Sequence, residues 1–409
     1  MSVQRLAVLS VHTSPLAQPG AGDGGGMNVY VRAVGSSLAR AGVACDVFTR
    51  ADHAEQPPVV AVEPGFRVLH LEAGPVAPVA RETLPALVDP FADAFLARLA
   101  ASDESYDVLH ANYWVSGAVG HRLKHDLELP LVATFHTLDR VKAEAGAGED
   151  PALRALTESD VVRCADLMVA ATVEERSQLV ELYGAEPDRI EIVPPGVDHR
   201  VFRPGDRLDA RRRLGLEGTP RLLLFVGRIQ ALKGASLAIG ALAALDDPEA
   251  VLLVVGGPSG HDGEAELARL HALVEELGVD DQVRFVPPQP HAQLATYYQA
   301  ADVCLVPSRT ESFGLVALEA AACGTPVVAA AVGGLPSIVE DGCTGFLVEG
   351  RGALDYAAPV AMLLDDVELA RAMGNDAAAR SARYAWSIAA ARLRRLYGDL
   401  AVREPVQCT

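Results

Sequence analysis

Two carboxylates and two cations carry the strongest chemical signal in the sequence. Glu311 and Glu319 flank the start of a predicted helix, and Arg228 and Lys233 follow an earlier apolar segment. Carboxylates accept hydrogen bonds from hydroxyl groups, whereas paired cations can neutralise the charge that accumulates on a leaving diphosphate. This combination indicates a site for a nucleotide sugar. A solvated surface pair is the alternative for the two cations taken alone.

The segment around the two glutamates also predicts an anion site. A short apolar run at 303–306 is typical of a buried strand, and a helix of Ala, Leu and Val follows and ends at Gly324 and Pro326. The amides of residues 313–316 have no acceptor within such a helix, and the helix dipole adds positive potential there. We therefore expect this loop to bind a phosphate. A strand–loop–helix unit without a ligand is the alternative.

Two further segments could contact the same ligand. The loop at 22–28 is rich in glycine, which lets a ligand touch the backbone, although a mobile surface loop is the alternative. His136 follows a predicted strand, and a structural histidine is the alternative there. No Ser-His-Asp arrangement, HExxH motif or Cys/His ligand cluster is apparent in the sequence, so we expect neither hydrolysis nor zinc chemistry.

Composition limits the class of protein. The chain has 409 residues, of which 50% are hydrophobic, and this is enough for two domains with full cores. Its net charge of −19 and its 5% aromatic content argue against a large nucleic-acid or anionic-membrane surface. No apolar run is long enough to span a membrane, so we expect a cytoplasmic protein. We expect most of its six cysteines to be small core residues, because they form no CxxC or paired spacing.

Strands and helices alternate twice along the chain, which predicts two α/β domains with doubly wound parallel sheets. A Pro/Gly-rich stretch beginning at Pro194 separates them, so we expect domains at 1–196 and 197–384. Ligands bind at the carboxyl ends of such sheets, and the polar loops should meet at one cleft between the domains. The predicted strands are 5–11, 43–49, 66–71, 108–109, 131–134, 166–171, 190–193, 222–226, 251–255, 283–285, 303–306, 326–330 and 345–348.

Taken together, these motifs resemble those of the retaining GT-B glycosyltransferases of family GT4. The resemblance rests on the segments 308–316 with Glu319, 227–234 and 24–30, and it covers essentially the whole chain. It implies a GT-B fold, with two Rossmann-like domains facing across a cleft and a C-terminal helix at about 385–409 that packs back on the first domain. Within the family, the segments 12–16, 113–117, 136–138 and 256–260 are most similar to enzymes that glycosylate an inositol phosphate.

The resemblance assigns roles to residues on the donor side. It implies that Glu319 binds the donor ribose and that Glu311 binds the donor sugar. Arg228 and Lys233 would stabilise the leaving diphosphate, and His136 would contact the transferred sugar near the reacting carbon. Further donor-binding residues are Gly25, Gly26, Gln289, Ser312, Phe313, Gly314, Leu315 and Val316.

On the acceptor side, the resemblance implies contacts from Asn28, Arg81, Tyr113, Thr137 and Arg154. By position alone, Arg81 and Arg154 are read as solvated surface charges. A lysine of the inositol-phosphate branch is replaced here by Arg81, and the sequence also departs from that branch at 111–112, Phe135 and 139–140.

The resemblance implies a retaining enzyme that transfers a sugar, N-acetylglucosamine or another hexose, from a nucleoside diphosphate to a small polar acceptor such as 1D-myo-inositol 3-phosphate. No cofactor and no metal are expected. The expected partners are the two substrates, with a homodimer as a possible assembly. Two alternatives remain: a secondary-metabolite glycosyltransferase acting on an aminocyclitol, a thiol or another small molecule, and a non-catalytic nucleotide-sugar binder.

Overall fold

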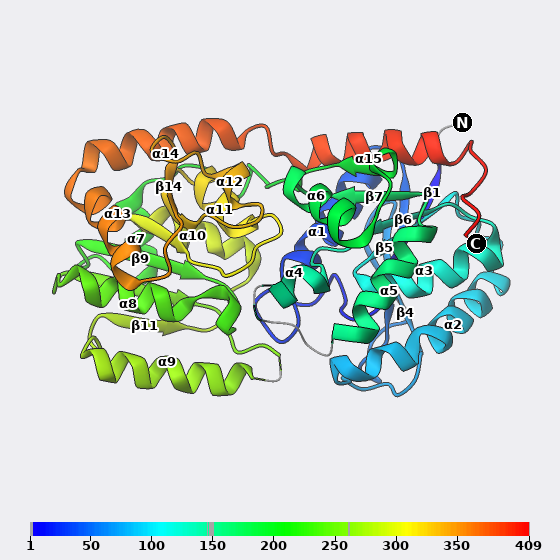
Figure 1. Cartoon of the computed structure of the whole chain (residues 1–409), viewed down its shortest axis with the longest axis horizontal. Coiled ribbons are helices and arrows are strands. Elements are labelled where there is room, and N and C mark those ends of the chain that lie inside the picture. Colours follow the sequence, from blue (N-terminus) through cyan, green and yellow to red (C-terminus); the bar gives the residue numbers. More distant parts are fainter. Residues whose placement is uncertain (1–2, 145, 147–150, 261, 409) are drawn as a thin grey trace. The chain divides into compact units, whose positions relative to one another are not determined.

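The computed structural model describes residues 3–144, 146, 151–260 and 262–408, and its elements are labelled in Figure 1. The chain forms two compact units, which are described separately. Unit 1 comprises residues 1–17, 27–194 and 386–409, and unit 2 comprises residues 18–26 and 195–385. The chain therefore enters unit 2 twice, first with the short loop 18–26 and then with the long segment that begins at Pro195.

Unit 1 contains an eight-stranded sheet in the order β3-β4-β2-β1-β5-β6-β7-β8. All neighbouring strands are parallel except the edge pair β3 and β4. The central strands are buried on both faces, as expected for continuous apolar runs in a parallel sheet. The strands are β1 Arg5–Leu9, β2 Ala44–Arg50, β3 Val59–Glu63, β4 Phe66–Leu71, β5 Val108–Asn112, β6 Leu131–Thr134, β7 Leu167–Ala170 and β8 Ile190–Ile192.

Helices lie alongside this sheet (Figure 1). α6 shows why they begin and end where they do: the Thr172 side chain caps its first turn by accepting from the Glu175 amide, and Gly184 ends it at φ +68°. The helical elements of unit 1 are α1 Gly26–Arg40, η1 Arg81–Leu87, α2 Val88–Ala100, α3 Trp114–Leu127, α4 Asp139–Glu144, α5 Pro151–Cys164, α6 Val173–Tyr183, η2 Pro187–Arg189 and α15 Trp386–Leu400.

Unit 2 contains a six-stranded parallel sheet in the order β11-β10-β9-β12-β13-β14. Its strands are β9 Arg221–Val226, β10 Ala250–Val255, β11 Val283–Val286, β12 Val303–Val306, β13 Val327–Ala330 and β14 Gly345–Val348. Its helical elements are α7 Arg207–Leu214, η3 Ala231–Lys233, α8 Ala235–Leu245, α9 Gly263–Leu277, η4 His291–Gln293, α10 Leu294–Ala300, α11 Leu315–Ala322, α12 Leu335–Ile338, α13 Ala353–Asp365 and α14 Val367–Ser381. The predicted fold class, two α/β domains with doubly wound sheets, is confirmed.

Each sheet has a switch point at which the strand order reverses: β1 with β5 in unit 1, and β9 with β12 in unit 2. Loops after the two strands of a switch point diverge to opposite faces and leave an opening at the carboxyl edge. Several polar segments singled out in the sequence follow these strands, among them Tyr113 after β5, Arg228 and Lys233 after β9 and Glu311 after β12. Others follow neighbouring strands, such as His136 after β6 and the segment 256–260 after β10.

The sequence analysis missed several elements of unit 1. β3 was not predicted, although four of its five residues are apolar; it lies at the sheet edge, where its side chains are only partly buried or exposed. α5 was missed because its hydrophobic and polar residues are not arranged on separate faces. The prediction that β5 ends at Leu109 was also wrong. The strand continues through His110 to Asn112, with all of its residues buried.

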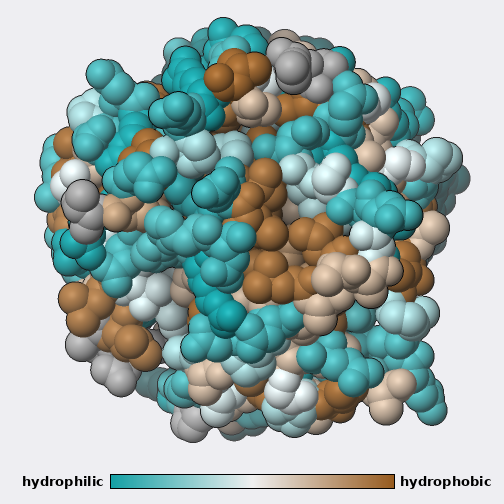
Figure 2. Space-filling model, turned by 90° about the vertical axis from the view of Figure 1, so that its right-hand side faces the viewer, coloured by the Kyte–Doolittle hydropathy of each residue, from teal (hydrophilic) through white to brown (hydrophobic). Residues whose placement is uncertain are grey.

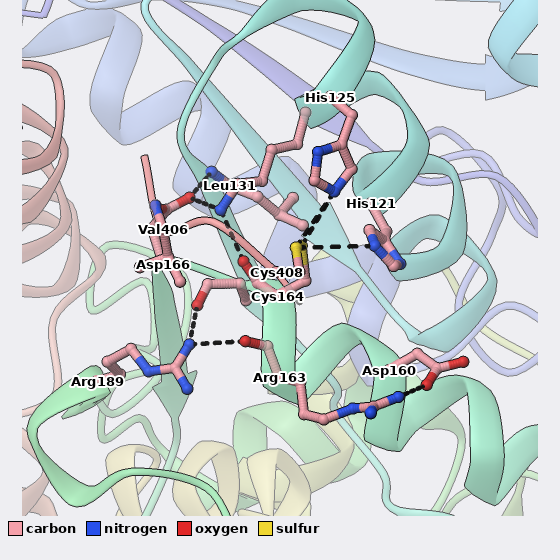
Figure 3. The surroundings of a disulfide bond; sticks show 12 residues. His121, His125, Leu131, Asp160, Arg163, Cys164, Asp166, Arg189, Val406 and Cys408 are labelled. Carbon is pink, nitrogen blue, oxygen red and sulfur yellow. Dashed lines mark hydrogen bonds and ion pairs between the residues drawn. A yellow bond between two sulfur atoms is a disulfide. The ribbon is translucent and has the colours of Figure 1, made fainter. Parts of the chain in front are cut away.

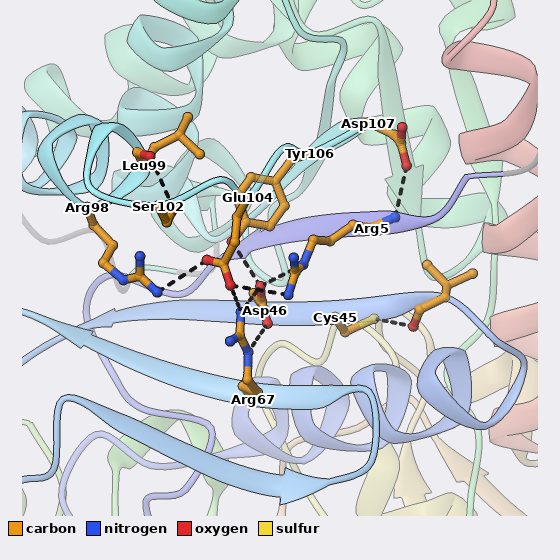
Figure 4. A network of polar contacts seen from close by, with 11 residues as sticks. Arg5, Cys45, Asp46, Arg67, Arg98, Leu99, Ser102, Glu104, Tyr106 and Asp107 are labelled. Atoms are coloured by element: carbon orange, nitrogen blue, oxygen red, sulfur yellow. Dashed lines mark hydrogen bonds and ion pairs between the residues drawn. The ribbon is translucent and has the colours of Figure 1, made fainter.

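A buried polar network ties three strands of unit 1 together (Figure 4). Asp46 on β2 is 1% exposed, accepts hydrogen bonds from Arg67 on β4 at 2.8 and 2.6 Å, and accepts one from the Tyr106 hydroxyl at 2.9 Å. Arg5 on β1 completes the network, with Nε 3.1 Å from the same carboxylate. The buried Asp46 carboxylate is thus paired with two partly exposed guanidinium groups, which offset the cost of burying its charge.

α15 belongs to unit 1, although the long second segment of unit 2 precedes it in the chain. Tyr397 lies on its buried face and its hydroxyl is 2.7 Å from Nδ1 of His110 on β5. Trp386 packs edge-on against Tyr30 of α1, with ring centroids 5.9 Å apart. These contacts attach the helix to the sheet of unit 1.

Side chains on the face shown in Figure 2 are mostly hydrophilic, with hydrophobic ones gathered near its centre. Among the described residues, no helix combines the length and the apolar character needed to cross a membrane.

The cysteines behave less uniformly than predicted. Cys45, Cys304 and Cys323 are buried, as expected of small core residues, whereas Cys343 is exposed. Cys164 and Cys408 form a disulfide across 244 residues of sequence. The sequence contains no paired spacing because the fold, and not local chain geometry, brings these two residues together.

Candidate active site

Lys233 and Glu311 form the centre of a group that we call the β9/β12 group, which also includes Arg228 and Glu319. The Nζ atom of Lys233, in η3 after β9, lies 2.6 Å from Oε2 of Glu311, which follows β12. Both side chains remain partly exposed, at 27% and 20%. An ion pair with this exposure can exchange its partner for a bound ligand at modest cost. The two residues therefore present a cation and a carboxylate at the switch point of unit 2.

The loops that carry these residues are bonded to one another through their backbones. The Ile229 amide donates to the Gly257 carbonyl, the Arg309 amide donates to the Leu232 carbonyl, and the Gly334 amide donates to the Glu311 carbonyl, each at 2.8 Å. Gly234 has φ +75°, and a Cβ there would lie 2.2 Å from the Pro307 carbonyl oxygen. The loops after β9, β10, β12 and β13 thus form one packed rim.

α11 starts within this rim. Gly314 precedes it at φ +103°, where a Cβ would approach Leu335 to 2.7 Å, so the backbone there requires glycine. The helix begins at Leu315, and the first amide bonded back along it is that of Leu318, which donates to the Gly314 carbonyl. The amides of Leu315 and Val316 therefore have no acceptor within the helix. The predicted phosphate-binding segment, including Phe313, lies beside Lys233 and Glu311.

Glu319 lies one turn further along α11 and is 5% exposed. Its two oxygens have separate partners: His291 Nε2 lies 2.6 Å from Oε1, and the Tyr298 hydroxyl donates to Oε2 at 2.9 Å. Phe202 packs on His291, with ring centroids 5.0 Å apart. The sequence analysis missed His291, Tyr298 and Phe202. The sequence predicted a helix over 291–300 but not this contact, because His291 and Glu319 are 28 residues apart.

Arg228 lies next to the glycine-rich loop. A Cβ on Gly25 would meet the Arg228 guanidinium at 3.4 Å, and one on Gly26 would meet Leu315 of α11 at 3.3 Å. The loop is attached to unit 2 through Gln18, whose Nε2 donates to the Pro288 carbonyl at 3.0 Å. For this reason residues 18–26 belong to unit 2, whereas the sequence analysis assigned all of 1–196 to the first domain.

Two other predicted donor residues lie on the same unit. Gln289 donates to the Pro287 carbonyl at 2.8 Å and so braces the loop after β11. Ser312 lies between Glu311 and Phe313, where a Cβ on Gly334 would meet its carbonyl oxygen at 2.5 Å. The residues predicted for the donor side, apart from His136, thus gather on the carboxyl edge of unit 2.

A second group, which we call the β5/β6 group, comprises Tyr113, His136, Thr137 and Arg154 in unit 1. Tyr113 directly follows β5 and has φ +78°. The Arg154 guanidinium lies 5.0 Å from the centroid of the Tyr113 ring, and its Nη2 donates to the carbonyl and the hydroxyl of Thr137 at 2.8 and 3.1 Å. Three residues predicted for the acceptor side are therefore in direct contact.

Arg154 is buried, at 7% exposed, and the alternative of a solvated surface charge is wrong. Its Nε donates to Glu158 at 2.8 Å and lies 3.8 Å from Asp139. Glu158 in turn accepts from the Asp139 amide and the Tyr183 hydroxyl. Although burial acts against the charge, Tyr113 and the carboxylates keep the pKa of Arg154 above its ordinary value. The guanidinium is a fixed positive charge.

His136 is held in an unusual backbone conformation, with φ +61°. Its Nε2 lies 2.9 Å from Oδ1 of Asn112, an atom that can only accept, so Nε2 carries the proton. Burial, reinforced by the nearby His110 and His12, lowers the pKa of His136 to about 3. The imidazole is therefore neutral at physiological pH and can exchange hydrogen bonds without adding charge.

Asn28 and Arg81 are the remaining residues predicted for the acceptor side. Asn28 at the start of α1 is 1% exposed, and its Nδ2 donates to the Thr13 hydroxyl at 3.0 Å and the Ser14 carbonyl at 2.7 Å. It braces the loop after β1. Arg81 begins η1, but its side chain lies outside the described part of the structure.

No Cys/His ligand cluster was apparent in the sequence, but the fold brings one together. His121, His125, Cys164 and Cys408 bring one potential ligand atom each to within 4.8 Å of one another. All four belong to unit 1 and lie apart from the β5/β6 group, at the amino edge of the sheet. Their separation along the sequence concealed them.

Comparison with known proteins agrees with this arrangement. Residues 25–196 match the family described as glycosyl transferase 4-like domain, and residues 206–380 match glycosyl transferases group 1. The chain is 46% identical over 407 residues to a D-inositol 3-phosphate glycosyltransferase of Thermobispora bispora, covering 97% of this chain and 95% of that one. It is 51% identical over 376 residues to a protein of the same name from Geodermatophilus obscurus, covering 90% and 83%.

Solved structures show the same fold. The sucrose-phosphate synthase of Thermosynechococcus elongatus superposes with a TM-score of 0.90 at 36% identity, covering 97% of this chain and 99% of that one. Anabaena Alr3699/HepE, solved with UDP and glucose, superposes with a TM-score of 0.79 at 20% identity, covering 97% and 100%, and supports the fold alone. Lys233 and Glu311 thus lie in a fold shared with known glycosyltransferases. The chain belongs to the GT4-like, group 1 family of glycosyltransferases with the GT-B fold.

Proposed function

We propose that this glycosyltransferase moves a hexose, N-acetylglucosamine or a related sugar, from a nucleoside diphosphate to a small polar acceptor with retention of configuration. The observation that carries the proposal is the contact of Lys233 with Glu311 beside the first turn of α11. The names of the relatives support an inositol phosphate, such as 1D-myo-inositol 3-phosphate, as the acceptor.

On the donor side, we assign the diphosphate to the amides at the start of α11 and to Arg228 and Lys233. Helix amides and two cations suit a group whose negative charge grows as its bond to the sugar breaks. Glu311 would accept hydrogen bonds from the sugar hydroxyls, and Glu319, oriented by His291 and Tyr298, from the ribose hydroxyls. Because Arg228 and Lys233 supply the positive charge, omitting divalent cations from the assay should leave turnover unchanged.

On the acceptor side, we assign the phosphate of the acceptor to Arg154 with Thr137 and Tyr113. A buried guanidinium whose orientation is fixed by Glu158 is a suitable phosphate ligand, since little entropy is lost on binding. Asn28 and Arg81 are further acceptor candidates. The neutral His136, whose Nε2 proton is bonded to Asn112, would contact the transferred sugar near its reacting carbon without adding charge there.

In the proposed reaction, the bond between the sugar C1 and the diphosphate oxygen breaks, and a bond from C1 to an acceptor hydroxyl oxygen forms on the same face. The hydroxyl proton passes to the departing diphosphate oxygen. Neither a protein base nor a covalent intermediate is then required. Charge stabilisation by Lys233 and Arg228, together with positioning, would supply the rate enhancement.

The same donor side could serve a secondary-metabolite enzyme whose acceptor is an aminocyclitol, a thiol or another small molecule. The observation that favours this second candidate is that residues next to the β5/β6 group, at 111–112, 135 and 139–140, differ from those of the inositol-phosphate branch. Asn112 holds His136 at 2.9 Å, and the Arg140 amide donates to the Tyr183 hydroxyl at 3.0 Å. Asn112 directly precedes Tyr113 in the chain, and Arg140 is linked to Arg154 through Tyr183 and Glu158.

A matrix of donors and acceptors tests both candidates. UDP-N-acetylglucosamine, UDP-glucose and GDP-mannose are each combined with 1D-myo-inositol 3-phosphate, myo-inositol, an aminocyclitol and a thiol. The readouts are nucleoside diphosphate release, product mass and the anomeric configuration by NMR. Turnover confined to the inositol phosphate supports the first candidate, and turnover confined to another acceptor supports the second. An inverted product rules out retention, and donor binding without transfer to any acceptor contradicts the proposal.

A further inference from the structure

Two cysteines and two histidines from three distant parts of unit 1 converge at one point (Figure 3). His125 Nε2 lies 3.3 Å from Cys164 Sγ and 3.2 Å from Cys408 Sγ, and His121 Nε2 lies 4.0 Å from Cys408 Sγ. We call these four residues the Cys/His cluster. Cys164 is buried, His121 and Cys408 are half-buried and His125 is exposed, so the cluster is open to solvent on one side.

The fold itself brings the four side chains together. His121 and His125 are four residues apart on α3 and therefore project from the same face of that helix. Cys164 is the last residue of α5, and α3 and α5 pack together. Cys408 lies in the tail that follows α15, beyond the last helix.

Polar contacts, of which those of Lys124 are buried, hold both sulfur-bearing segments. Lys124, between the two histidines, donates to the Cys164 carbonyl at 2.7 Å and to Asp166 at 2.8 Å. The other oxygen of Asp166 accepts from the Val406 amide at 2.5 Å and so holds the tail two residues before Cys408. Arg189 donates to the carbonyls on either side of Cys164, those of Arg163 and Ala165, at 3.0 Å each. The bond at Val406 therefore keeps the Cys408 side chain close to Cys164 and the two histidines.

The disulfide between Cys164 and Cys408 accounts for two of the four residues. It does not account for two imidazoles aimed at the sulfur atoms. In a tetrahedral zinc site with Zn–S bonds of about 2.3 Å and Zn–N bonds of about 2.0 Å, neighbouring ligand atoms are roughly 3.3–3.8 Å apart. The observed nitrogen–sulfur separations, 3.2 to 4.0 Å, bracket this range.

We propose that His121, His125, Cys164 and Cys408 bind one Zn²⁺ when the cysteines are reduced. Two thiolates and two imidazoles are a borderline-soft ligand set that suits zinc, and four protein ligands define a closed, structural site. The ion would fasten the C-terminal tail to α3 and α5. The cluster lies at the amino edge of the sheet, so the site is distinct from the proposed acceptor group.

The redox balance is simple. The Cys164–Cys408 bond takes up two electrons and two protons from a dithiol reductant, giving two thiols and one oxidised reductant. Binding of Zn²⁺ then releases both thiol protons as the thiolates coordinate the ion. The disulfide and the zinc-bound cluster are thus alternative states of the same two cysteines.

Metal analysis of the full chain tests the proposal. Protein produced with zinc in the medium, purified under a dithiol reductant and desalted, should contain about one zinc per chain by mass spectrometry. His121→Ala and His125→Ala should lose most of this zinc, whereas the matched controls His53→Ala and Cys343→Ser should retain it. Exposed His53 and Cys343 lie outside the cluster. Co²⁺ in place of zinc should show the visible absorption of a tetrahedral site and a thiolate charge-transfer band, and Cys408→Ser should lose that band.

The histidine variants separate the proposal from a simple disulfide, which needs neither imidazole. Reduced wild-type protein that holds no stoichiometric zinc, or zinc that persists in the His121→Ala, His125→Ala double variant, overturns the proposal. Circular dichroism confirms that each variant is folded before its metal content is compared. Because the wild type and the control variants are also analysed, a variant that fails to fold does not decide the outcome.

Discussion

Lys233 Nζ lies 2.6 Å from Oε2 of Glu311, so the loop after β9 and the loop after β12 meet through one ion pair at the switch point of unit 2. Neither residue is fully buried, and under the proposed function Lys233 supplies positive charge to the departing diphosphate. β9 and β12 are neighbours in the sheet, so the loops that follow them lie close enough for Lys233 and Glu311 to form this ion pair.

Replacement of Lys233 by alanine should reduce kcat by two to three orders of magnitude, because one charge that stabilises the leaving group is lost, a loss of about 3–4 kcal/mol. Initial rates of nucleoside diphosphate release measure this effect. Arg212→Ala, which removes an exposed charge of the same unit, is the control and should have wild-type kinetics. A Lys233→Ala enzyme with normal kcat would remove Lys233 from the leaving-group role.

His291→Ala should raise the KM for the donor by about 10-fold with a smaller change in kcat, because Glu319 loses the partner that orients Oε1. The buried Tyr298 still holds Oε2, so the carboxylate stays in place but is less well oriented. Kinetics with the donor varied at saturating acceptor give the two constants. An unchanged donor KM, with His53→Ala as the histidine control, would argue against a positioning role for His291.

Thr137→Ala should raise the KM for the acceptor by about 3- to 10-fold and leave the KM for the donor unchanged. The reason is that Arg154 loses the hydroxyl contact at 3.1 Å but keeps its bond to the Thr137 carbonyl at 2.8 Å. Thr157→Ala, which removes a hydroxyl bonded only within α5, is the matched control. A rise in the donor KM instead would place Thr137 on the donor side.

Glu175→Gln should stabilise unit 1 at neutral and higher pH. Burial raises the pKa of Glu175 from 4.5 to about 7, although the Ala171 amide at 2.6 Å acts in the opposite direction. The folded pKa lies above the unfolded one, so the wild type loses stability as pH rises through the interval between them and the loss is complete above about 7.

Because glutamine does not ionise, the difference in free energy of unfolding between Glu175→Gln and the wild type should grow across this interval, up to about 3 kcal/mol. Thermal unfolding measured at about pH 5 and about pH 8 checks this. Glu174→Gln is the matched control, because the neighbouring Glu174 is exposed and should show no such trend. A pH-independent difference for Glu175→Gln would contradict the raised pKa.

The sequence by itself determined the alternation of strands and helices, the two α/β domains and the family. It did so because buried parallel strands are continuous apolar runs, and because the glycines near α11 and η3 occupy backbone positions that no other residue fits. It also singled out Lys233, Glu311 and Glu319 as candidates, since each lies near a strand end or a helix start that local patterns reveal. Helix α5 lacked such a local signal, whereas the apolar run of edge strand β3 was overlooked.

Only the tertiary structure decided which of these residues are partners. The contact of Glu319 with His291, the burial of Arg154 against Glu158 and Tyr113, and the assignment of residues 18–26 to unit 2 all depend on segments that are distant in sequence. The Cys/His cluster is the clearest case, because its ligands come from α3, α5 and the tail after α15. Periodicity and spacing report local geometry, whereas these sites are created by packing between elements that share no local pattern.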